Sequence, residues 1–166
     1  MNAQIVWRVL SLAALTVALG GQGMAQGQDQ TKVGGLINDY TAALDAGGPW
    51  HIVGQWSLAM QGDSGKADFS VALSMVRADN PVRSPHTHHV WVTDGEVTAL
   101  PNGYRITGAG VMTGNGNTAG FSGSPVTLEV TGGNAVEFSN VSVTFGGGAV
   151  GHFGTEPLDG VVTDRR

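Results

Sequence analysis

The sequence predicts an all-β protein: a small antiparallel up-and-down barrel with one short N-terminal helix. From residue 50 onward, apolar and polar residues alternate with a period of two, as in strands with one buried face. The 27 glycines lie between these apolar runs, and only 13% of residues are charged, which is typical of short strands joined by tight turns. A closed barrel is favoured because closure removes unpaired strand edges; a β-sandwich is the alternative.

The first 25 residues have the pattern of a secretory signal peptide. Arg8 precedes an apolar run over residues 9–19, and Gly23 and Ala25 are small residues at −3 and −1 of a cleavage site. The run is shorter than the roughly 20 residues of a membrane-spanning helix. We therefore expect a periplasmic or secreted protein that is not inserted in a membrane after signal cleavage.

The remaining chain is expected to form a flexible segment, residues 26–32, and a single domain, residues 33–166. A helix is predicted over residues 33–46, and Gly47-Gly48-Pro49 would end it. The helix prediction depends on apolar residues spaced three and four apart, namely Val33, Leu36, Ile37, Tyr40, Ala43 and Leu44.

The strands are expected between turn signals along the rest of the chain. Asp94-Gly95 predicts a tight hairpin turn between residues 90–93 and 96–100. Gly108 and Gly110 predict a bend or bulge inside a strand over residues 104–113. The other expected strands cover residues 52–61, 67–75, 126–130 and 136–145, with a last short apolar pair at 161–162.

Composition excludes several classes of function. The chain has 8 basic and 13 acidic residues and a formal net charge of −5, so it offers no basic face for nucleic acid. It has no cysteine, which excludes disulfides, thiol chemistry and a thiolate metal site. Nucleophile-elbow, P-loop and dinucleotide-binding motifs are absent from the sequence.

Three of the five histidines cluster at the start of an apolar segment, in Pro85-His86-Thr87-His88-His89. In a strand, His86 and His88 would point to the same face and His89 to the other. Two imidazoles in this arrangement can bind one Zn²⁺, Cu²⁺ or Ni²⁺ ion. The alternative is a polar loop in which the histidines make ordinary hydrogen bonds or are solvated.

A metal site built on the His-x-His pair needs further ligands from elsewhere in the chain. We select His152, which lies between glycines in Gly151-His152-Phe153-Gly154, as the third ligand or as a general base. His51, His89 or an acidic residue are the other candidates. The pair is similar to the start of the cupin metal motif, but positions 92 and 93 are Val and Thr where that motif carries Glu.

Gly54-Gln55-Trp56 resembles the G-x-W signature of lipocalins, which opens the first strand after a short N-terminal helix. The resemblance implies a barrel with Trp56 at its closed base and a small apolar ligand inside. The chain lacks the disulfide cysteines of that family.

Apolar side chains on the inward faces are candidates to line a cavity for a small apolar ligand. The interior of an eight-stranded barrel has room for its own side chains or for one small ligand, so the sequence leaves both arrangements open. The ligand-binding candidates are Trp56, Phe69, Leu73, Met75, Trp91 and Phe138.

The first hypothesis for function is an exported protein that binds a small apolar ligand, with the histidines at the rim of its barrel and a Zn or Cu ion there as an optional addition. The second is a small barrel enzyme, an isomerase, cyclase or metal-assisted enzyme, that uses His86, His88 and His152. This second hypothesis requires the three imidazoles to lie together. The third is a structural or adhesive exported module.

Overall fold

The computed structural model describes residues 31–41, 49–115, 117–132 and 140–165. The expected signal peptide, residues 26–30 of the expected flexible segment, and Phe138 lie outside the described residues. Lys32, which was expected in that segment, begins the first strand. Among the described residues, no helix has the length and apolar character needed to cross a membrane.

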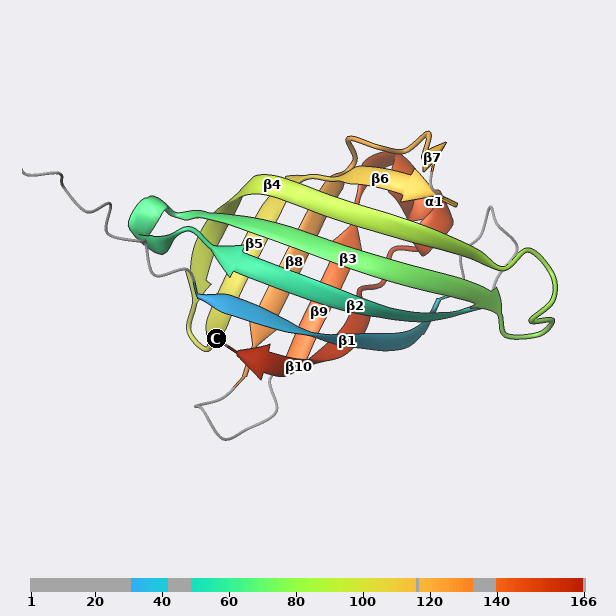
Figure 1. Cartoon of the computed structure of the whole chain (residues 1–166), viewed down its shortest axis with the longest axis horizontal. Helices are drawn as coiled ribbons and strands as arrows, with labels where there is room; N and C mark the ends of the chain where they lie inside the picture. Colours follow the sequence, from blue (N-terminus) through green and yellow to red (C-terminus); the bar gives the residue numbers. More distant parts are fainter. Residues whose placement is uncertain (1–30, 42–48, 116, 133–139, 166) are drawn as a thin grey trace, which may run out of the picture.

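The chain closes into an eight-stranded antiparallel barrel, in which each strand pairs with its neighbours along the chain (Figure 1). Two of the ten strands named below, β5 and β6, share one place in this barrel, and β7 lies outside it. The closing pairs are β3 with β4 and β1 with β10. The up-and-down barrel is therefore confirmed, and the sandwich alternative is wrong. The strands are β1 (Lys32–Thr41), β2 (Trp50–Met60), β3 (Lys66–Arg77), β4 (His86–Leu100), β5 (Gly103–Ala109), β6 (Val111–Gly114), β7 (Asn117–Thr118), β8 (Pro125–Thr131), β9 (Asn140–Phe145) and β10 (Leu158–Arg165).

Strands β5 and β6 together form the position beside β4. The second half of β4 pairs with β5 and its first half pairs with β6, with an interruption at Gly110. The strand expected over residues 104–113 is thus interrupted at Gly110, one of the two glycines where a bend or bulge was predicted. Among the described strands, the short β7 pairs with β6 alone, and it extends the sheet beyond the barrel closure.

The predicted N-terminal helix is wrong, because its described part is strand β1; residues 42–46 of the prediction lie outside the described residues. Leu36 and Tyr40, which helical spacing had placed on a buried face, are 46% and 63% exposed on the outside of the barrel. Gly35 and Ile37 point inward instead. Adjacent glycines at 34 and 35 would each cost a helix about 1 kcal/mol, whereas a strand can use them for close approach of backbones.

The predicted turn at Asp94-Gly95 is also wrong, because β4 continues through it as a 15-residue strand. Asp94 has a positive φ of 53°, and the register of β4 against β3 shifts at this point. Thr93 and Asp94 together lie opposite Asp68, and the Asp68 carboxylate accepts a hydrogen bond from the Asp94 backbone N–H. The left-handed residue thus forms a β-bulge that bends a continuing strand.

The barrel interior is filled by apolar side chains that belong to one cluster. The alternation predicted for residues 67–75 is confirmed, since every second residue of this range is at most 2% exposed. Gly54-Gln55-Trp56 lies in the middle of the second strand, β2, and the described residues before it form strand β1. It therefore does not have the position of the lipocalin signature, which opens the first strand after a helix. Trp56 is nevertheless a core residue, and its indole Nε1 donates to the Val161 carbonyl 3.3 Å away.

Two short helical turns follow β9 at one end of the barrel, beside β6 and β7 (Figure 1). They are η2 (Gly147–Ala149) and α1 (Val150–Phe153); a third turn, η1 (Gly62–Ser64), connects β2 to β3. The Phe153 ring stacks on Phe145 with centroids 4.1 Å apart. The Thr41 hydroxyl donates to the Phe153 carbonyl at 2.7 Å. These contacts hold α1 against the barrel end.

Candidate metal centre

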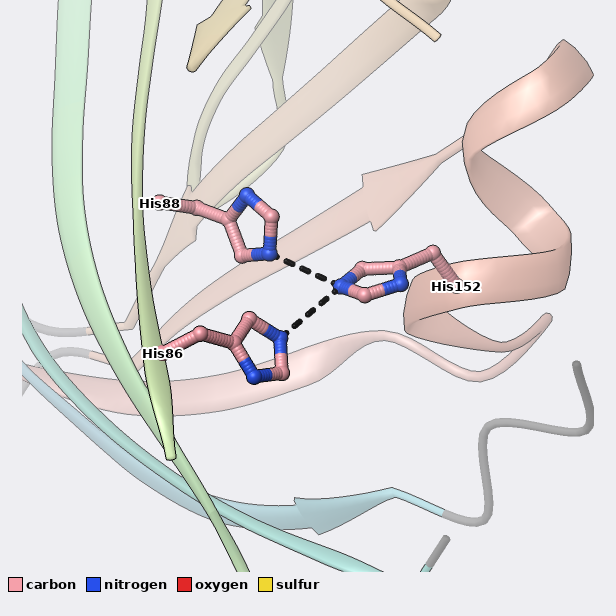
Figure 2. A group of neighbouring side chains, drawn as sticks. All are labelled: His86, His88 and His152. Carbon is pink, nitrogen blue, oxygen red and sulfur yellow. Dashed lines mark hydrogen bonds between the residues drawn. The ribbon is translucent and has the colours of Figure 1, made fainter. Parts of the chain in front are cut away.

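Three histidine side chains converge at the end of the barrel that carries α1. His86 and His88 project inward from the first residues of β4, as their spacing predicted, and His152 meets them from α1 (Figure 2). The Nε2 atom of His152 lies 3.2 Å from Nε2 of His86 and 2.8 Å from Nε2 of His88. All three ligand atoms lie within 4.8 Å of one another, in positions where they could hold one metal ion.

Backbone carbonyl groups fix the orientation of two of the rings. The Nδ1 atom of His86 lies 2.8 Å from the Ser84 carbonyl oxygen, and Nδ1 of His88 lies 2.7 Å from the Thr113 carbonyl oxygen. A carbonyl oxygen only accepts, so each Nδ1 must carry the hydrogen. In the neutral imidazoles the Nε2 lone pairs therefore face the cluster, which is the arrangement that metal-binding histidines adopt.

Three neutral rings cannot satisfy all the hydrogen-bond acceptors at the centre of the cluster. His86 and His88 each present an Nε2 acceptor to the same atom, Nε2 of His152. That nitrogen carries at most one hydrogen, so it can make at most one well-aligned hydrogen bond to the two acceptors. A cation between the three rings would use all three lone pairs at once.

The spacing of the ring nitrogens fits a small divalent ion. Zn–N bonds of 2.0–2.1 Å in a tetrahedron place two nitrogen ligands about 3.3 Å apart. The two Nε2–Nε2 distances of 2.8 and 3.2 Å are slightly shorter. Since the three nitrogens already lie within 4.8 Å, an ion could be accommodated by small ring movements.

Aromatic rings surround the cluster on several sides. Phe121 stacks on His152 with centroids 5.2 Å apart, and Phe153 lies edge-on to His88 at 5.2 Å. Trp50 lies edge-on to His86 at 4.9 Å. His88 is only 5% exposed, whereas His86 and His152 are partly exposed. The site is thus apolar at its base and reachable from solvent at its rim.

Burial lowers the pKa of His88 from 6.5 to about 4. Removal of the ring from water is the main cause, and the nearby His152 and His86 lower the pKa further; the bond to the Thr113 carbonyl opposes both. At neutral pH His88 is therefore an uncharged ring with its Nε2 lone pair available to a metal.

The shifted pKa predicts how the stability of the metal-free protein depends on pH. The unfolded chain binds a proton at His88 below about pH 6.5, whereas the folded chain binds one only below about pH 4. The free energy of unfolding is therefore unaffected by this group above pH 6.5, and it decreases as the pH falls from 6.5 to 4. With allowance for solvent at the rim, the expected loss is about 2 kcal/mol. Urea unfolding with a chelator at pH 7.5 and 4.5 should show a smaller difference for His88→Gln than for the wild type. Equal differences would contradict the shifted pKa.

The other two histidines do not join the cluster. His51 Nε2 lies 2.7 Å from the Asn38 side-chain oxygen, and the ring stacks on Tyr40. His89 is on the opposite face of β4 from His88, where it contacts Trp91 at a centroid distance of 5.0 Å. Both lie on the outside of the barrel.

The apolar candidates from the sequence occupy different places. Four of them, Trp56, Phe69, Leu73 and Met75, are packed in the core at no more than 3% exposure. Trp91 is on the outer face beside His89, and Phe138 lies outside the described residues. Trp56, Phe69 and Trp91 border one hollow of about 710 Å³, whereas Leu73 and Met75 are not part of its lining.

Several residues that build the centre were missed by sequence reasoning. Phe153 adjoins His152 in the chain, so its proximity was a usable signal, whereas nothing in the sequence places Phe121 or Trp50 beside histidines far away in the chain. The carbonyl groups of Ser84 and Thr113 are backbone atoms, and no residue pattern reports which of them accepts a ring hydrogen.

Comparison with known proteins gives no identification: no family model matches the chain, and neither a curated protein nor a solved structure matches it.

Proposed function

We propose that the protein binds one Zn²⁺ or Cu²⁺ ion through the Nε2 atoms of His86, His88 and His152. The observation that carries the proposal is the convergence of three Nε2 atoms, two of them on rings whose Nδ1 atoms are bonded to carbonyl groups. Neutral imidazole is a good ligand for both ions. We place this function outside the cytoplasm, in the periplasm or the secreted fraction, on the basis of the signal-peptide pattern over residues 1–25.

Binding of a small apolar ligand in the interior is less well supported than metal binding. The inward candidates Trp56, Phe69 and Leu73 are buried members of the core cluster. A ligand among them would have to displace packed side chains, at a cost of lost contacts. The metal site needs only small movements of the three imidazole rings.

A metal-assisted enzyme is the second candidate function. His152 lies beside both His86 and His88, which meets the requirement of that hypothesis. Partial exposure of His86 and His152 gives a reactant access to the ion. Catalytic zinc sites combine three protein ligands with a position for water or substrate.

The proposal is tested by native mass spectrometry of the untagged protein after exposure to Zn²⁺ or Cu²⁺ and removal of loosely bound ions. We expect one ion per chain for the wild type. The double variant His86→Ala/His88→Ala should carry none, because it retains only one of the three nitrogens.

The matched control is His51→Ala/His89→Ala, which removes the same number of imidazoles from outside the cluster. It should retain one ion per chain, since both rings lie on the outer face. A wild type without metal, or an equal loss of metal from both double variants, would refute the proposed site.

A further inference from the structure

The histidine cluster supplies only three ligands among the residues that the structure describes. Zn²⁺ in proteins is almost always four-coordinate, with a closed set of protein ligands at structural sites and an open position at catalytic ones. If the proposed function holds, the ion therefore has a fourth position to fill. All three ligands are neutral imidazoles, so they leave the charge of the ion uncompensated.

The surroundings of the cluster disfavour an uncompensated positive charge on the metal ion. The rings of Phe121, Phe153 and Trp50 pack around the histidines, and the described part of the chain places no carboxylate in the ligand group. A charge in an apolar environment is stable only when it is paired. A small anion in the fourth position would compensate part of the charge directly at the ion.

Trp50 presents a second, independent feature of the site. Its side chain is 1% exposed, and its Nε1 atom is buried without a hydrogen-bond partner in the described part of the chain. An unpaired buried N–H costs about 1–3 kcal/mol, so such groups call for an explanation. The ring lies edge-on to His86, with centroids 4.9 Å apart, so this unpaired N–H belongs to a residue that contacts the cluster.

We infer that the metal ion keeps its fourth coordination position for a small anion, which accepts a hydrogen bond from the Trp50 indole N–H. The ligand is of one chemical class, an anion with a compact donor atom. It can arise from water, which loses one proton to solvent and stays on the ion as hydroxide, or it can be an exogenous carboxylate. Trp50 acts on the anion and not as a metal ligand.

The test uses the full protein loaded with one Co²⁺ per chain, whose visible spectrum reports the ligands of the ion. Azide should change the spectrum in a saturable way, which shows an exchangeable position. A spectral change with pH in the absence of added anions would identify hydroxide, and one produced by acetate at fixed pH would identify a carboxylate.

Trp50→Phe keeps an aromatic ring and removes the N–H. It should still bind one Co²⁺, with affinity for azide reduced about tenfold or more, the effect expected for a hydrogen bond to a charged group. Trp91→Phe makes the same change on the outer face and should leave azide affinity unchanged. In the wild type with Zn²⁺, the Trp50 indole N–H resonance should shift on azide addition, which tests the contact without any substitution.

The outcomes separate this inference from the proposed function. A protein that binds no Co²⁺ refutes the metal site itself. One Co²⁺ per chain with a spectrum insensitive to azide, acetate and pH would mean that the protein supplies the fourth ligand, and the inference fails while the metal site stands. Equal azide affinity in Trp50→Phe and wild type, together with an unshifted indole resonance, would remove the role of Trp50.

Discussion

Saturating Zn²⁺ is expected to raise the thermal unfolding midpoint of the wild type by about 10 °C. An ion that binds only the folded state at 100 times its dissociation constant adds about 2.7 kcal/mol to the free energy of unfolding, and each kcal/mol raises the midpoint of a domain of this size by about 4 °C. The ion would connect β4 to α1 through residues 64 positions apart, such as His88 and His152. Differential scanning calorimetry with chelator or with Zn²⁺ measures the shift directly.

His152→Ala is the informative variant for this prediction, because it leaves the pair on β4 intact. Two imidazoles bind Zn²⁺ more weakly than three, so we expect most of the shift to disappear at the same zinc concentration. His89→Ala, with its imidazole on the opposite face of the same strand, should retain the full shift. A full shift in His152→Ala would show that α1 takes no part in binding.

Gly35→Ala is expected to destabilise the protein by about 3 kcal/mol or more, which is at the upper end for overpacking in a core. A Cβ atom at Gly35 would clash with the Val161 backbone carbonyl and come within 2.9 Å of the Trp56 Nε1 atom. The same indole and carbonyl form a hydrogen bond across β1, so the indole needs the space that the absent side chain leaves. Urea unfolding monitored by tryptophan fluorescence measures the change.

Gly120→Ala is the matched control for this substitution. A Cβ atom at Gly120 would meet no atom within 4 Å, so the expected change is within about 0.5 kcal/mol. Equal stability of the two variants would show that the close approach of Trp56 to β1 is not a real constraint on the barrel.

Strand alternation predicted the barrel and two of the three proposed metal ligands for the same reason. The inward residues of β3 are apolar at every second position, so a period-two pattern identifies them without knowledge of the partner strands. His86 and His88 have the same spacing and therefore had to share a face once β4 formed. His152 was selected as the third ligand from several candidates. The sequence could not single it out, because its distance from β4 depends on how α1 packs against the barrel end.

The wrongly predicted helix over residues 33–46 and the wrongly predicted turn at Asp94-Gly95 have a common physical origin. In each case the local sequence fits two structures, and pairing with strands far away in the chain determines which one forms. Leu36 and Tyr40 fit a helix as well as the outer face of a strand, and pairing of β1 with both β2 and β10 selected the strand. Asp94-Gly95 favours a left-handed backbone in a turn and also in a bulge. Since β3 and β5 continue the pairing on both sides of β4, the bulge formed.

The central claim, one metal ion held by three imidazoles at the barrel end, is tested most directly by anomalous diffraction at the zinc edge from crystals grown with Zn²⁺. We predict one strong peak about 2.0–2.1 Å from the Nε2 atoms of His86, His88 and His152, with the Nδ1 atoms of His86 and His88 still bonded to the Ser84 and Thr113 carbonyls. A peak at His51 or His89 instead, or no peak within reach of the three Nε2 atoms in zinc-saturated crystals, would contradict the account.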